Sequence, residues 1–176
     1  MARLPTETEA AVYRLWTVHG GATRPCSLGR RPPLRAALVA LICDTGPLYA
    51  AMDQADSDHV RCAQLLADAV DALVVPAPVL VELDWLAGNR LGPVAMGALL
   101  LDIEEGALRV VDLVAEDYSR VRELCAQYAD LPLGLVDAAV VALTERLAET
   151  TLATLDHRHF SIVRPCHTPS LTLLPE

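Results

Sequence analysis

Short apolar runs alternate along most of this chain with segments that repeat apolar residues every three or four positions. Four runs read as buried strands because turn-forming or charged residues bound each of them: 38–43, 73–75, 108–111 and 151–154. Residues 171–174 predict a further strand at an edge. Strands that alternate with helical segments predict an α/β domain of three layers, with a mainly parallel central sheet of four to five strands flanked by helices.

The helical segments between these strands each have an apolar face that can cover the sheet. We expect helices at 47–52, 59–70, 78–87, 93–103, 115–128 and 136–147. The second of them would bury His59, Cys62, Ala63, Leu66 and Val70, and the fourth would bury Met96, Leu99, Leu100 and Ile103. The pair Gly88-Asn89 predicts the end of the third helix, since glycine and asparagine commonly follow a helix C-terminus.

The first part of the chain has a different composition from the rest. Residues 1–37 contain four prolines, a Gly-Gly pair and six arginines, with weak apolar periodicity. We expect a poorly ordered N-terminal extension there, followed by one domain over residues 38–176, which is long enough to bury a core. A basic arm that touches RNA, or sequence upstream of the true start, are the alternatives for the extension.

Charge and cysteine content narrow the class of protein. Residues 41–176 hold eight arginines against 21 acids, a balance of −13. Such an acidic body argues against strong non-specific nucleic-acid binding and fits a cation or a basic partner. No apolar run reaches 18 residues, so we expect no membrane span. The five cysteines form no CxxC pair, which favours a reducing cytoplasm.

Four acids lie where the predicted fold could bring them together. Asp44 and Asp156 each follow a strand, whereas Glu82 and Asp137 lie beside the apolar stripes of two helices. The crevice outside the carboxyl ends of parallel strands is where such folds bind ligands. Four crowded carboxylates repel one another unless a cation neutralises them, and hard oxygen ligands suit Mg²⁺ or Mn²⁺.

Each of these acids also has a purely structural interpretation. Asp44 could form a turn, Asp137 could lie in the first turn of a helix where the dipole favours it, and Asp156 could cap the turn that follows it. Helical spacing does not choose between Glu82 and Asp84, because both flank the same apolar stripe.

Four motifs in order resemble the PIN domain, and more closely the VapC toxins of type II toxin–antitoxin pairs. They are Ile42-Cys43-Asp44-Thr45, Val81-Glu82-Leu83, Leu133 to Ala138 and Thr154 to Phe160, and the resemblance covers residues 40–165. It implies a PIN-like fold and a Mg²⁺-dependent endoribonuclease that hydrolyses RNA phosphodiester bonds. The catalytic and metal-binding residues would be Asp44, Glu82, Asp137 and Asp156, with the hydroxyls of Thr45 and Thr154 beside them.

The same resemblance implies the partners. We expect a VapB-type antitoxin, an RNA substrate (tRNA, rRNA or mRNA) and a homodimer in the cytoplasm, with DNA bound by the antitoxin and not by this chain. Carboxylates attract guanidinium groups, so the antitoxin should place an Arg or Lys among the acids and lay a flexible segment along an apolar groove. Three arginines are candidates for phosphate contact: Arg90, Arg158 and Arg164. His157 and His159 flank Asp156 and read as surface or supporting residues.

Two other functions fit parts of the sequence. Asp44-Thr45-Gly46 is also the tripeptide of aspartic proteases, but those enzymes have a mostly β fold and need a second such carboxylate. An inactive acidic PIN-like module that grips a basic partner is the non-enzyme alternative. Four intact acids argue against loss of activity, and metal-dependent cleavage of RNA would separate the enzyme from the module.

Overall fold

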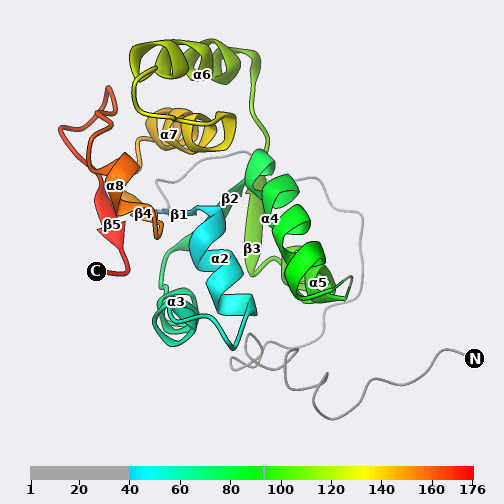
Figure 1. The fold of residues 1–176 in the computed structure, drawn as a ribbon. Coiled ribbons are helices and arrows are strands. Elements are labelled where there is room, and N and C mark those ends of the chain that lie inside the picture. The colour runs from blue at the N-terminus through cyan, green and yellow to red at the C-terminus, as the bar shows by residue number, and fades with distance from the viewer. Residues whose placement is uncertain (1–39, 93) are drawn as a thin grey trace, which may run out of the picture. The chain divides into compact units, whose positions relative to one another are not determined.

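One parallel sheet organises the described part of the chain. The computed structural model describes residues 40–92 and 94–176, so the extension predicted at 1–37 lies outside the described residues. The strands are β1 (Ala40–Cys43), β2 (Ala72–Pro76), β3 (Leu108–Val111), β4 (Thr151–Ala153) and β5 (Thr172–Leu174). They pair in the order β3-β2-β1-β4-β5, and every pairing is parallel (Figure 1). The predicted α/β class and five-stranded sheet are confirmed.

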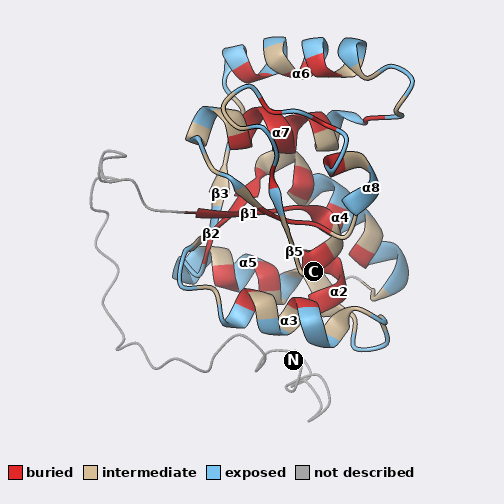
Figure 2. Cartoon of the chain, turned by 90° about the vertical axis from the view of Figure 1, so that its left-hand side faces the viewer, coloured by how far each residue is buried: buried red, intermediate tan, exposed pale blue. Residues whose placement is uncertain are grey.

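Helices cover both sides of this sheet. The described residues form α2 (Thr45–Met52), α3 (His59–Ala67), α4 (Ala77–Arg90), α5 (Ala95–Glu105), α6 (Ala115–Gln127), α7 (Leu135–Leu147) and α8 (His157–Phe160). In both views α7 lies on one side of the sheet with α6 stacked over it, whereas α2 and α3 lie on the other side (Figures 1 and 2). The sheet is therefore the middle layer of the fold.

The core lies where the central strands meet α7. All four residues of β1 are buried, as are Leu73 to Pro76 of β2. Parallel strands covered on both faces read as continuous apolar runs, and this is the pattern that predicted them. Helix α7 is buried at seven consecutive positions, Ala138 to Thr144 (Figure 2). A helix that is apolar on all sides needs cover on its outer face as well, and α6 provides it.

Two helices end at different places from those predicted. Helix α4 continues through Gly88-Asn89 to Arg90, and the left-handed residue that follows it is Gly92, with φ of +90°. Helix α3 ends at Ala67, so Val70 lies beyond its last turn and is 99% exposed. The prediction that Val70 is buried is wrong because the helical period does not extend past the end of the helix.

Helix α5 presents a different face to the core from the one predicted. Leu100 was expected inside but is 55% exposed, whereas Asp102 is 6% exposed. The helix packs against β3 and α4 along the line of Leu99 and Asp102. Helix α5 contains four leucine or isoleucine residues, so its apolar stripe is broader than the face that β3 and α4 cover. The sequence pattern therefore did not define how α5 is rotated about its own axis.

Candidate active site

The site lies at the carboxyl ends of β1 and β4, which are neighbouring strands. Cys43 pairs with Ala153 at the end of the two strands, and the Asp44 N–H donates to the Ala153 carbonyl at 2.9 Å. Asp44 therefore follows β1 beside the point where Thr154 follows β4. Two segments that are 110 residues apart in the sequence are held side by side by the parallel register.

Asp44 is almost completely enclosed. Its side chain begins α2, where Oδ1 accepts the Thr45 N–H at 2.7 Å, and the residue is 6% exposed. Oδ2 accepts the hydroxyl of Thr154 at 2.8 Å. Thr154 is fully buried, and its Oγ1 also accepts the Asp156 N–H at 3.0 Å. One hydroxyl thus links the acid after β1 to the acid after β4.

Helix α4 brings Glu82 to the same place. The hydroxyl of Thr45 donates to Glu82 Oε2 at 2.5 Å. Asp84 is exposed and has no hydrogen bond or ion pair with any described residue. The rotation of α4 against α2 therefore decides between the two acids that the sequence left open, and it places Glu82 beside Asp44.

Asp137 and Asp156 have structural roles as well as a place in the site. Asp137 lies in the first turn of α7, where Oδ2 accepts the Gly134 N–H at 3.0 Å. Asp156 begins α8, where Oδ1 accepts the His159 N–H at 3.0 Å, and Oδ2 lies 2.6 Å from His159 Nδ1 without the geometry of a hydrogen bond. Because each capping bond occupies only part of a carboxylate, both acids retain oxygens for a ligand.

Neighbouring carboxylates of the site raise the pKa values of Asp44 and Asp137. Burial raises the pKa of Asp44 to about 6, and the nearby charges of Asp137 and Glu82 raise it further, while the bonds from Thr154 and the Thr45 N–H oppose the shift. Burial also raises the pKa of Asp137, and the charges of Asp156 and Glu82 add to this. No ion pair between a described arginine and Asp44, Glu82 or Asp137 compensates these charges.

The chemistry of this donor set fits a hard divalent cation. Carboxylates that lie close enough to repel one another are the ligands that Mg²⁺ and Mn²⁺ take, and here Asp44 is buried, Asp137 and Asp156 are half-buried and Glu82 is exposed. Within residues 40–92 and 94–176, no three His, Cys, Asp or Glu side chains stand close enough together to hold a metal ion. The described acids therefore do not form a closed metal cage.

A groove runs past Glu82; the sequence analysis expected an apolar groove but did not locate it. It has a volume of about 850 Å³, and its lining includes Val81, Glu82 and Trp85 from α4, Tyr118 from α6, and Leu135 and Val136 from α7; we call it the α4–α7 groove. Trp85 is 68% and Val81 is 73% exposed. Trp85 was the sequence signal for this groove, because it is a large aromatic residue that lies outside the buried stripe of an amphipathic helix.

The three arginines considered for phosphate contact have different surroundings. The Arg90 guanidinium lies 5.6 Å from the centroid of the Tyr49 ring. Arg90 is the last residue of α4, whereas the candidate site lies near the beginning of that helix. Arg164 donates to the carbonyls of Ser161 and Val163. Arg158 is exposed on α8, two residues after Asp156, and is the one of the three nearest in sequence to the site.

Comparison with known proteins places the chain in a family. A family model described as PIN domain matches residues 41–164. Over 135 residues the chain is 36% identical to Ribonuclease VapC26 of Mycobacterium tuberculosis. The matched region covers 77% of this chain and all of that protein. The chain therefore belongs to the PIN-domain family, and the resemblance to its VapC-type members is confirmed.

Two solved structures share the fold. VapC20 of Mycobacterium tuberculosis, described as a sarcin–ricin loop cleaving toxin, superposes with a TM-score of 0.59 at 20% identity, over 64% of this chain and 86% of that one. VapBC2 of Rickettsia felis, bound to a DNA fragment from its promoter, gives 0.56 at 18% identity, over 76% of this chain and 98% of that one. At these identities the likeness shows the fold alone.

The sequence predicted no membrane span, and the helices of the structure can be compared with that expectation. No helix within the described residues has the length and the hydropathy needed to cross a bilayer.

Proposed function

We propose that this chain is the toxin of a type II toxin–antitoxin pair and that it is a Mg²⁺-dependent endoribonuclease. The observation that carries the proposal is the proximity of the acids: the charges of Asp137 and Glu82 raise the pKa of Asp44, and those of Asp156 and Glu82 raise the pKa of Asp137. The identity of 36% to a relative named as a ribonuclease supports the same conclusion.

The roles of the residues follow from their contacts. The four acids would hold Mg²⁺, or Mn²⁺, which when bound supplies an activated water and neutralises charge on the phosphate. The Thr154 hydroxyl orients Asp44 through Oδ2, and the Thr45 hydroxyl orients Glu82. The Thr154 hydroxyl also opposes the rise in the pKa of Asp44 and so favours the charged form that a cation needs.

Cleavage of RNA with matched variants on one helix tests the proposal. Glu82→Gln removes a proposed ligand, whereas Asp84→Asn changes an exposed acid two residues away. We expect Glu82→Gln to lower the rate about 100-fold or more and Asp84→Asn to leave it unchanged. Chelation of the metal should stop cleavage and added Mg²⁺ should restore it.

Two outcomes of that assay would contradict the proposal in different ways. Cleavage that persists without any divalent metal would exclude the metal site. Mg²⁺ binding without cleavage of any cellular RNA would favour the acidic binding module. Mapping of the cut positions on total RNA would also identify the substrate as tRNA, rRNA or mRNA.

We further propose that a VapB-type antitoxin occupies the α4–α7 groove. The groove offers Val81, Trp85 and Leu135 to apolar side chains, and Glu82 at its wall offers a carboxylate to an Arg. A flexible segment with an apolar face and a basic residue complements that surface. We expect Trp85→Ala to weaken the complex about tenfold or more in co-purification and calorimetry. Val60→Ala, a change at an exposed apolar residue of α3, should leave the affinity unchanged.

The remaining expectations concern assembly and location. Leu100 and Leu101 leave apolar surface on α5, which is consistent with the homodimer that we propose and that sedimentation velocity would test. The acidic balance of residues 41–176 agrees with DNA binding by the antitoxin and not by this chain. The described cysteines are all free thiols, as suits the cytoplasm in which we place the protein.

A further inference from the structure

The first turn of α2 lies unusually close to the loop that follows β4. A Cβ atom at Gly46 would lie 3.2 Å from the Cβ of Leu155 and 3.5 Å from its backbone nitrogen. Carbon atoms in favourable contact are about 3.5–4.0 Å apart, so any side chain at position 46 would require Leu155 to move. A residue other than glycine at position 46 therefore requires Leu155 to give way by a few tenths of an ångström.

Backbone conformation does not explain this glycine. Gly46 is the second residue of α2, and its φ lies outside the left-handed region, so an alanine could adopt the same backbone. Glycine weakens a helix relative to alanine. Gly88 in α4 is also helical, yet a Cβ there would meet no atom within 4 Å. The close approach to Leu155 is therefore what distinguishes Gly46.

Leu155 stands between two groups of the site. On one side of it is Thr154, whose hydroxyl donates to Asp44 at 2.8 Å. On the other side is Asp156, whose N–H donates to Thr154 Oγ1 at 3.0 Å. A shift of the Leu155 backbone by a few tenths of an ångström would lengthen both bonds and move Asp156 relative to Asp44.

We propose that Gly46 is a positioning residue, an inference that rests on the proposed metal-dependent activity. The absence of a side chain at position 46 lets the segment 154–156 rest against the segment 44–46. That contact sets the separation of the carboxylates of Asp44 and Asp156, and so the geometry of the oxygens available to a divalent cation. The residue acts through Leu155 and Thr154 and touches neither metal nor substrate.

The test compares Gly46→Ala with Gly88→Ala in the full chain, using Mn²⁺ as the probe. Because misplacement of reacting groups by about 1 Å can cost about 100-fold, we expect a smaller shift here to cost about tenfold. Gly46→Ala should need about tenfold more Mn²⁺ for its half-maximal rise in Tm, and its kcat for RNA should fall about tenfold with KM unchanged. Gly88→Ala should match the wild type in Mn²⁺ response and kcat, with an equal or higher Tm.

A second substitution at the contact separates positioning from a general loss of structure. Leu155→Gly removes the Cβ that position 46 would meet. We expect Gly46→Ala to lower the metal-free Tm by at least about 2 °C in the wild-type background, and to leave it unchanged or raise it in the Leu155→Gly background, where only the helix preference for alanine remains. Leu155→Gly should likewise remove the effect of Gly46→Ala on Mn²⁺ response and kcat.

The inference is overturned if Gly46→Ala responds to Mn²⁺ and cleaves RNA as the wild type does. It is also overturned if Gly46→Ala has the same effect on Tm in both backgrounds. If the wild-type protein itself neither binds Mn²⁺ nor cleaves RNA, the proposed function fails, and the Tm comparison alone then decides whether Gly46 positions the segment 154–156.

Discussion

Three aspartates of the site begin or cap helices, and this dual use is the main feature at the scale of single residues. Asp44 begins α2, Asp156 begins α8, and Asp137 bonds the Gly134 N–H ahead of α7. A carboxylate has about four acceptor positions, so one capping bond does not exhaust it. The structural and the functional interpretations of these acids are therefore compatible, and the caps orient the carboxylates that we propose as ligands.

Substitution of Asp44 tests the link between charge and function. Asp44→Asn keeps the shape but removes a proposed ligand, so RNA cleavage should fall about 100-fold or more with the fold retained. Without metal the variant should be more stable, by on the order of 1 kcal/mol, because burial and the charges of Asp137 and Glu82 disfavour the ionised form. Cleavage assays and metal-free thermal unfolding measure the two effects. An unchanged cleavage rate would refute the role of Asp44.

Asp102 gives a pH-dependent prediction away from the site. Its Oδ2 is buried without a hydrogen-bond partner, and burial followed by the charge of Glu105 raises its pKa from 3.8 to about 6. A raised pKa in the folded state means that this acid favours folding most below pH 4, and that the favourable contribution is lost as pH rises through 6.

Asp102→Asn removes that ionisable group. We expect the variant and the wild type to have similar stability near pH 4, and the variant to be more stable by on the order of 1 kcal/mol at pH 8. Urea unfolding at several pH values between 4 and 8 measures the difference. A difference in the free energy of unfolding that stays constant from pH 4 to pH 8 would contradict the raised pKa of Asp102, because titration of this carboxyl group must make the difference depend on pH.

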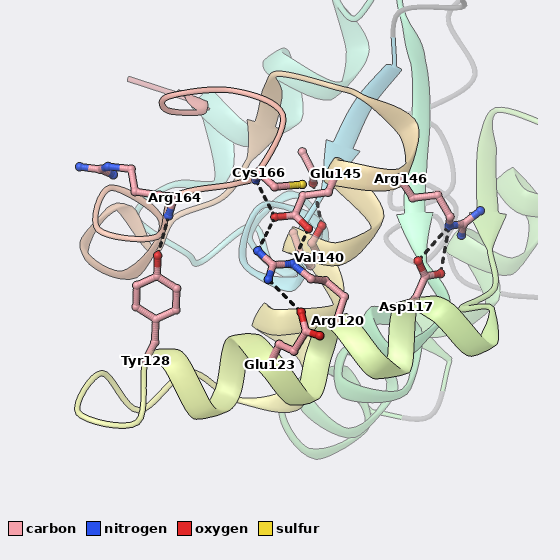
Figure 3. Close-up of polar contacts among 10 residues, drawn as sticks. Asp117, Arg120, Glu123, Tyr128, Val140, Glu145, Arg146, Arg164 and Cys166 are labelled. Atoms are coloured by element: carbon pink, nitrogen blue, oxygen red, sulfur yellow. Dashed lines mark hydrogen bonds and ion pairs between the residues drawn. The ribbon is translucent and has the colours of Figure 1, made fainter.

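At the scale of elements, ion pairs between arginines and carboxylates connect α6 to α7. Arg120 donates to both oxygens of Glu145 at 2.7 and 2.9 Å, and Arg146 lies 3.0 Å from Asp117 (Figure 3). Glu145 also accepts the Cys166 N–H at 2.8 Å, which ties in the loop before β5. These contacts hold α6 over the outer face of α7, whose inner positions contact the sheet.

The Arg120–Glu145 ion pair should contribute more to the free energy of unfolding than the more exposed ion pairs Arg120–Glu123 and Arg61–Asp58. The Glu145 side chain is 6% exposed, and although burial raises its pKa, Arg120 and the Cys166 N–H outweigh this and hold the pKa below its usual value. Arg120→Ala would leave a buried charge unpaired, so we expect a loss of about 3 kcal/mol in the free energy of unfolding.

A matched substitution on α6 controls for the loss of an arginine. Arg122 is exposed on the same helix, and Arg122→Ala should change the free energy of unfolding by less than about 0.5 kcal/mol. Urea unfolding of both variants measures the comparison. Equal effects of the two substitutions would show that the Arg120–Glu145 pair makes no special contribution.

At the scale of the whole molecule, the described residues contain a buried core. The five strands and the helices on both sides of them lie within residues 40–176, and the buried side chains come from β1, β2, α2 and α7 above all. The stability of the domain should therefore depend on this part of the chain.

Deletion of residues 1–35 tests that conclusion. The shortened chain should fold, with a Tm within about 2 °C of the full chain, because the composition of the deleted segment offers little to bury. It should also retain RNA cleavage. Thermal unfolding and the cleavage assay measure both properties, and a fall in Tm of more than about 5 °C would show that the deleted segment contributes to the packing.

The sequence by itself predicted the order of the five strands and of every described helix except α8, and it singled out the four acids that we propose for the site. Apolar runs bounded by turns predicted all five strands, and the pattern was clearest for β1 and β2, because parallel strands buried on both faces are apolar throughout. The positions of Asp44 and Asp156 followed from the same pattern, because an acid directly after a buried strand must lie at the edge of the sheet.

Only the tertiary structure decided how the helices are rotated and how closely segments approach. The apolar stripe of α4 is flanked by both Glu82 and Asp84, and contact with Thr45 on α2 selects Glu82. Neighbouring elements likewise bury Asp102 of α5 in place of Leu100. The 3.2 Å approach of Gly46 to Leu155 joins residues that are far apart in the chain, so no local pattern contains it. Local periodicity specifies which residues can face a core, whereas packing against distant partners determines which of them do.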